Sequence, residues 1–100
     1  MDMAGVPEFS TGSKTGIGST AVSITTREMN ASRGVQIMAS TSNSVAVYIG
    51  PQGVTAGTSS ADTDGFPLAA GESVVVPVIE PNKIYAITAS STASLSFMLV

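Results

Sequence analysis

The chain has 100 residues, a net charge of −3, no cysteine and no histidine. A chain of this length forms one domain of ordinary size. The missing residue types exclude disulfides, thiolate metal sites and the histidine that most often acts as general base, so we expect no enzyme activity, no cofactor and no bound metal. The four basic residues, Lys14, Arg27, Arg33 and Lys83, are scattered, and we expect no nucleic-acid binding.

The sequence shows neither the pattern of a membrane helix nor that of an export signal. No apolar run approaches the roughly 20 residues of a membrane helix. The start "MDMAGVPEFS" lacks the basic flank and apolar stretch of a signal peptide, so we expect synthesis in a cytoplasm. Only 11% of the residues are charged, against about 25% in average soluble proteins. A surface with so little charge suits permanent contact with neighbours.

Residues 1–18 contain four glycines and one proline among small polar residues. This composition cannot bury much apolar area, which predicts a flexible N-terminal arm over 1–18 and a folded domain over 19–100. The arm is either a frayed terminus or a segment that orders only against a neighbouring subunit. For the second alternative, the residues that would hold a neighbour are Val6, Pro7 and Phe9.

From residue 20 onward, short runs rich in β-branched and aromatic residues alternate with glycine, asparagine, serine and proline, which is the pattern of strands joined by turns. The expected strands cover 20–26, 34–40, 44–50, a short stretch around Val54, 73–78, 84–89 and 94–100. Turns are expected at 41–43, 50–53 and 80–83, and a long exposed loop at 56–65. Residues 26–34 offer one helical turn at most. The pattern predicts an all-β fold: an antiparallel β-sandwich or a jelly-roll-like small barrel.

Two long stretches carry no charge, residues 34–61 and the seventeen residues after Lys83. Monomeric β proteins usually protect their edge strands with lysine, proline or inward charges. The strand "SLSFMLV" at 94–100 has no such protection, and Val75 places an apolar side chain on the second face of its strand. Either these strands are central in the sandwich, or a second subunit covers them. The second interpretation predicts a homo-oligomer whose interface contains Val45, Val47, Ile49, Val75, Leu95, Phe97, Met98 and Val100.

The motif "DTDG" at 62–65 is similar to the start of a calcium loop. A complete loop needs a glutamate at its twelfth position, where this chain has Ser73. We therefore interpret the motif as a solvated turn.

The segment from Val45 to about Ala89 resembles a group of small β-rich virion proteins of tailed bacteriophages. The similarity consists of a strand that ends in "YIG", a "GVT" step, the turn "GFPLAAGES", a valine-rich strand and the hairpin "NKIYAI". The long insert "TSSADTDG" departs from that pattern.

The resemblance implies a capsid decoration, or cement, protein on the surface of a virion. Such a protein binds itself, often as a trimer, and the major capsid protein, without a nucleic acid or a membrane as partner. Val6, Pro7 and Phe9 would then clamp the capsid. The alternative is a tail, neck or fibre module whose 55–65 loop binds a receptor or a carbohydrate.

Overall fold

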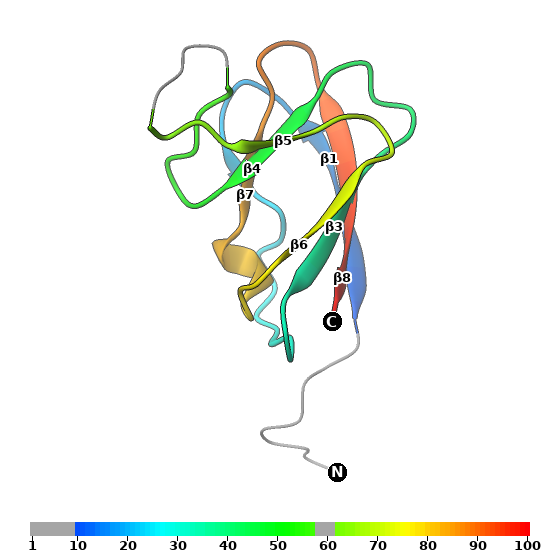
Figure 1. Cartoon of the computed structure of the whole chain (residues 1–100), viewed down its shortest axis with the longest axis vertical. Coiled ribbons are helices and arrows are strands. Elements are labelled where there is room, and N and C mark those ends of the chain that lie inside the picture. The colour runs from blue at the N-terminus through cyan, green and yellow to red at the C-terminus, as the bar shows by residue number, and fades with distance from the viewer. Residues whose placement is uncertain (1–9, 58–61) are drawn as a thin grey trace.

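The computed structural model describes residues 10–57 and 62–100, which form eight β-strands in two four-stranded antiparallel sheets (Figure 1). The strands are β1 (Thr11–Ile17), β2 (Val22–Ser23), β3 (Val35–Ala39), β4 (Val47–Gly50), β5 (Phe66–Leu68), β6 (Ser73–Val76), β7 (Tyr85–Ile87) and β8 (Ala93–Leu99). One 3₁₀ turn covers Pro81–Lys83, within the expected turn at 80–83. The predicted all-β sandwich is confirmed.

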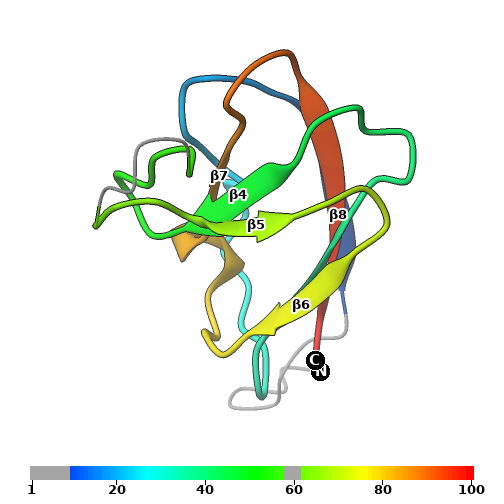
Figure 2. The ribbon, with the colours of Figure 1, turned by 45° about the horizontal axis from the view of Figure 1, so that its top comes forward.

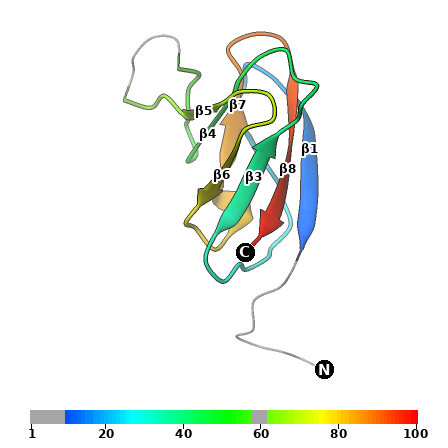
Figure 3. The same ribbon diagram turned by 45° about the vertical axis from the view of Figure 1, so that its right-hand side comes forward.

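The strand pairing is nested: β1 pairs with β8, β2 with β7, β3 with β6, and β4 with β5. Two further pairings join these hairpins into the sheets β1-β8-β3-β6 and β2-β7-β4-β5. This order is the connectivity of a jelly roll, in which a long hairpin is wrapped into two facing sheets. Figure 3 shows the first sheet from β1 at one edge, through β8 and β3, to β6 at the other.

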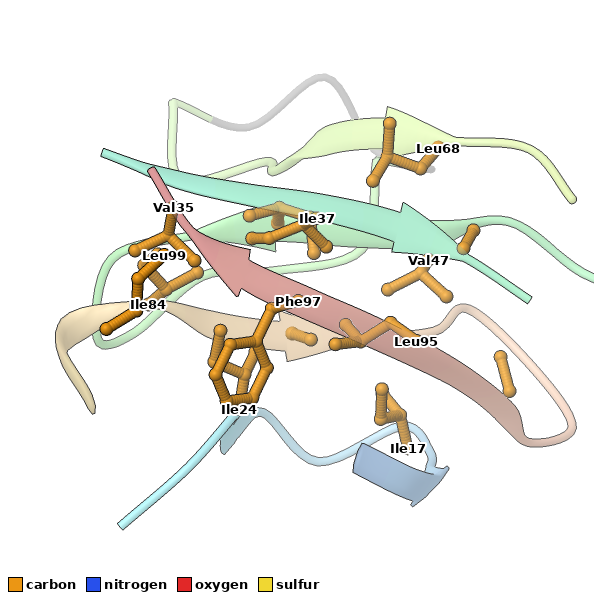
Figure 4. Packing of buried hydrophobic residues seen from close by; sticks show 14 of the residues in the cluster. Ile17, Ile24, Val35, Ile37, Val47, Leu68, Ile84, Leu95, Phe97 and Leu99 are labelled. Atoms are coloured by element: carbon orange, nitrogen blue, oxygen red, sulfur yellow. The ribbon is translucent and has the colours of Figure 1, made fainter. Parts of the chain in front are cut away.

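The core lies between the two sheets and follows from the alternation along each strand. In β8, Leu95, Phe97 and Leu99 are buried, whereas Ser96 is exposed. Figure 4 shows these three side chains pointing into the space between the sheets. The buried cluster also contains residues of both sheets and of their connections: Ile17, Ile24, Val35, Ile37, Val47, Ile49, Leu68, Ile84 and Ala86.

Side chains fix two of the loops to the sandwich. The amide of Asn43 bonds the main chain of Ser94 twice: Nδ2 donates to the carbonyl oxygen over 2.8 Å, and Oδ1 accepts from the amide over 2.9 Å. Thr55 Oγ1 donates to Asp64 Oδ1 over 2.7 Å and closes the neck of the 55–65 loop. Residues 58–61 of that loop lie outside the described part of the chain.

The structure corrects the predicted boundary of the arm. Residues 11–17 form edge strand β1, so the prediction of an arm over 1–18 is wrong for these residues. The run "TGSKTGI" has little apolar alternation because only Ile17 of β1 is fully buried, so the other positions do not require apolar side chains. Its extended form comes from main-chain pairing with β8. The remainder of the predicted arm, including Val6, Pro7 and Phe9, lies outside the described residues.

Two further strand predictions need correction. The strand expected around Val54 is absent from the described residues; Thr55 forms one isolated bridge with Asp64. Phe66–Leu68, which the sequence predicted as part of a turn, is strand β5. Proline concealed this strand because Pro67 lacks an amide hydrogen, a feature that sheets accept at an edge. No helical turn forms at 26–34.

Candidate interaction surface

An apolar groove of about 350 Å³ opens where the free edges of β5 and β6 approach each other. Figure 2 shows these two strands as neighbours that belong to different sheets. The residues that line the groove are mainly apolar: Ile49, Gly50, Pro51, Phe66, Val74, Val75, Val76, Pro77, Val78, Lys83 and Ile84. Lys83 is the one charged residue among them. The groove exists because the sandwich remains open on this side.

Large apolar side chains are exposed around the groove. Phe66 is 59% exposed, Val75 49%, Ile79 52% and Val78 36%. They come from β5, from β6 and from the segment that follows Pro77. Single exposed apolar residues are common, but an exposed set concentrated around one groove is typical of an interaction site. We call these four residues the β6 patch.

A second hollow, of about 600 Å³, lies on the outer face of the β1-β8-β3-β6 sheet. Met38 and Met98 line it together with Gln36 and Ser96, and the described residues that line it are all uncharged. Met38 is 41% exposed. Methionine adapts to irregular partner surfaces, so this face suits contact with a protein better than contact with a charged ligand.

The predicted subunit interface divides into two groups in the structure. Val47, Ile49, Leu95 and Phe97 are at most 5% exposed and belong to the core, so their assignment to a subunit interface is wrong. The sandwich buries them because its second sheet covers the apolar face that the sequence left without a partner. Strand β8 is central, between β1 and β3, which was the alternative interpretation.

The other predicted interface residues retain some exposure. Val45, Met98 and Val100 are half-buried, and Val75 is exposed at the edge of the sheet. Sequence analysis missed Phe66, Val78 and Ile79. The run "VVVPVI" could have indicated Val78 and Ile79, because Pro77 ends the strand while apolar residues continue beyond it.

The acidic side chains do not assemble into a candidate metal site in the part of the chain that the structure describes. No group of three or more Asp, Glu, His or Cys side chains forms within the described ranges. Of the two carboxylates of "DTDG", Asp62 is exposed and Asp64 accepts a hydrogen bond from Thr55. Residues 10–57 and 62–100 likewise contain no helix long and apolar enough to cross a membrane.

Comparison with known proteins finds no match for this chain among protein-family models, curated proteins or solved structures. The resemblance of residues 45–89 to phage virion proteins therefore stays a prediction from the sequence.

Proposed function

We propose that this chain is a structural component of a tailed-phage particle, which decorates and stabilises the capsid by binding itself and the major capsid protein. The resemblance of residues 45–89 suggests this class, and it makes a trimer on the virion surface the expected assembly. The proposal includes no catalysis, cofactor, nucleic acid or membrane.

The observation that carries this proposal is the β6 patch with its groove. A single domain that worked alone in solution would gain nothing from four exposed apolar side chains beside an open sheet edge, and would risk aggregation. In an assembly, the same surface becomes a contact. The uncharged outer face with Met38 and Met98 provides a second surface, so one copy has room for two kinds of partner.

Counting copies of the chain in intact virions tests the proposal. A decoration protein follows the symmetry of the shell and reaches hundreds of copies, whereas a neck or tail part reaches about a dozen. Purified protein added to undecorated capsids should bind to saturation and raise the temperature at which the capsids open. Absence of the chain from heads, or binding without any effect on capsid stability, would contradict decoration.

A tail, neck or fibre module that binds a receptor or carbohydrate is the alternative. Carbohydrate sites usually stack sugars on aromatic rings, and this chain has only three phenylalanines, two tyrosines and no tryptophan. One of these rings, that of Tyr48, lies next to Gly57 in the described part of the 55–65 loop. Binding of labelled protein to host cells lacking any capsid would favour this alternative.

A further inference from the structure

We propose that the free edge of β6 binds β6 of a second copy, antiparallel and about a two-fold axis through Val74, so that two four-stranded sheets become one. The inference deepens the self-association in the proposed function and rests on it for biological context. A two-fold contact is separate from the three-fold contact of a trimer, and it predicts an even number of chains: two, or six where trimers are joined.

Among the described residues, three of the four sheet edges carry features that oppose pairing with a further strand. At the β1 edge, Arg27 Nη2 donates to the carbonyl oxygen of Thr11 over 3.0 Å, and the register shifts between Lys14 and Ile17. Strand β2 has only two residues. Strand β5 carries Pro67 at its centre. Charge, bulge, shortness and proline are the usual devices against edge pairing.

Strand β6 has none of these devices within Ser73–Val76, and Glu72 and Pro77 stand just outside its two ends. Ser73–Val76 is four residues long, uncharged, free of proline and without a register shift against β3. It is the open end of its sheet. The contrast with the other three edges singles out β6 as the strand that accepts a partner.

The hydrogen-bonding phase of β6 shows which of its main-chain groups face outward. Ala39 donates to the carbonyl oxygen of Glu72 over 2.9 Å and accepts from the amide of Gly71 over 3.0 Å, so the main chain of Ala39 is directed toward β6 and its preceding turn. Bonded and non-bonded pairs alternate in an antiparallel ladder, so Val74 and Val76 direct their amides and carbonyls toward β3. The amides and carbonyls of Ser73 and Val75 therefore face the free edge.

These outward groups match a second copy in one register. With Val74 opposite Val74 of the second copy, Ser73 lies opposite Val75 of the second copy, and each of these two pairs is a bonded pair. The side chain of Val74 lines the groove, as does Phe66 of β5. The added strand therefore covers the mouth of the groove in both copies.

Charge is complementary in this orientation. Glu72 precedes β6 at one end, where its Oε1 accepts from the amide of Ala69 over 2.8 Å. Lys83 lines the groove near the other end, with Val76 and Pro77. Antiparallel pairing places Glu72 opposite Val76 of the second copy, on the side where Lys83 lines the groove and where Glu80 begins the same turn. A parallel arrangement would bring like charges together.

The exposed area is also of the right size. At roughly 150–200 Å² for a fully exposed side chain of this size, the β6 patch carries about 350 Å² of apolar surface. An interface of about 800 Å² per copy with some 60% apolar area needs about 480 Å². Pro51 and Pro77, which are exposed and line the same groove, add apolar surface to the patch.

A single-cysteine crosslink tests the register directly, because the natural chain has no cysteine. In a non-bonded antiparallel pair the Cα atoms are about 4.5 Å apart, within the range of a disulfide. Val74→Cys should therefore form a covalent dimer on mild oxidation. Val76→Cys is the matched control: same strand, same face, also half-buried, but about 13 Å from its counterpart. Absence of a Val74 crosslink, or equal crosslinking of both variants, would overturn the proposal.

Native mass spectrometry gives an independent test. The natural protein should contain an even number of chains, and Val75→Lys should halve that number, while Ser13→Lys on the opposite edge strand should not. Phe66→Ser, at a mostly exposed position, should raise the dissociation constant about tenfold or more without affecting the fold. A natural protein with one or three chains, or unchanged assembly in both β6-patch variants, refutes the contact.

The two proposals fail in different ways. Intact crosslinking through Val74 with no capsid binding would refute the virion role and leave the β6 contact in place. Capsid binding that persists without crosslinking through Val74 would refute the β6 contact and leave the virion role in place.

Discussion

Gly12 in β1 lies above the ring of Phe97, and this contact makes a prediction in which two effects have opposite signs. Replacing glycine by alanine inside a strand ordinarily stabilises a protein by about 0.5–1 kcal/mol. Here a Cβ atom at position 12 would lie 2.6 Å from Cζ and 2.8 Å from Cε2 of Phe97, and 2.9 Å from Nη2 of Arg27. Ordinary carbon–carbon contacts are about 3.5–4 Å, so several atoms must move.

The ring has little room to move because Phe97 is only 3% exposed and belongs to the core. Overpacking of this kind costs about 1–3 kcal/mol, which exceeds the gain in backbone entropy. We therefore expect Gly12→Ala to destabilise the fold by about 1–2 kcal/mol, or by roughly 4–16 °C in Tm for a domain of this size.

Phe97→Leu should relieve the clash. Alone it costs about 1–2 kcal/mol through lost burial and a small cavity. In the double variant, the alanine methyl group occupies space that the ring has left, so the two costs should not add, and the coupling should be about 1–2 kcal/mol in favour of the double variant. Urea unfolding gives each free energy, with an unchanged slope as the sign of a two-state comparison.

Gly18→Ala is the control, since no heavy atom lies within 4 Å of a Cβ atom at that position. It should be neutral or slightly stabilising. Additive costs in the Gly12–Phe97 cycle, or a stabilising Gly12→Ala, would show that the ring does not lie beneath β1 as described.

Three further predictions concern stability and use the same unfolding assay. Asn43→Ala removes both bonds to the main chain of Ser94 and should cost about 1–3 kcal/mol; an unchanged midpoint would contradict the anchoring role. Gly34→Ala brings a methyl group against the carbonyl oxygen of Val76 and should lower the free energy of unfolding by about 2 kcal/mol or more. An unchanged free energy would show that β3 and β6 separate at that end. Leu95→Ala should lower the free energy of unfolding by about 2–5 kcal/mol because Leu95 is buried. Val75→Thr, at an exposed position, should change it by no more than about 0.5 kcal/mol when the protein is dilute and monomeric. Equal costs for the two variants would argue against the reassignment of Leu95 to the core.

Alternation along the chain was sufficient to predict most of the strands. The runs at 34–40, 73–78 and 84–89 each contain a strand that is shorter than predicted, because pairing ends before the apolar pattern does. The run at 94–100 corresponds to β8, which has the predicted length and begins one residue earlier. Composition likewise identified an all-β sandwich, since short alternating runs without helical spacing have few other ways to bury their apolar face.

Edge strands β1 and β5, and the partner that covers each apolar face, could not be predicted in the same way. The sequence of β1 contains little apolar alternation, and β5 contains a proline, so neither has the usual strand pattern. For Leu95 and Phe97 the sequence shows an apolar face that must be covered, but the same face would satisfy a second sheet or a second subunit. Only the tertiary structure shows that the second sheet covers it.

The local pattern by itself determined which residues alternate, and hence the all-β class, because the side-chain period of a strand is set by its backbone. Which edges are closed depends on contacts between residues far apart in the chain, such as Arg27 with Thr11 and β5 with β4. The tertiary structure alone therefore decided that Val75 and Phe66 stay exposed next to the groove. It also decided that four other residues assigned to the interface lie in the core: Val47, Ile49, Leu95 and Phe97.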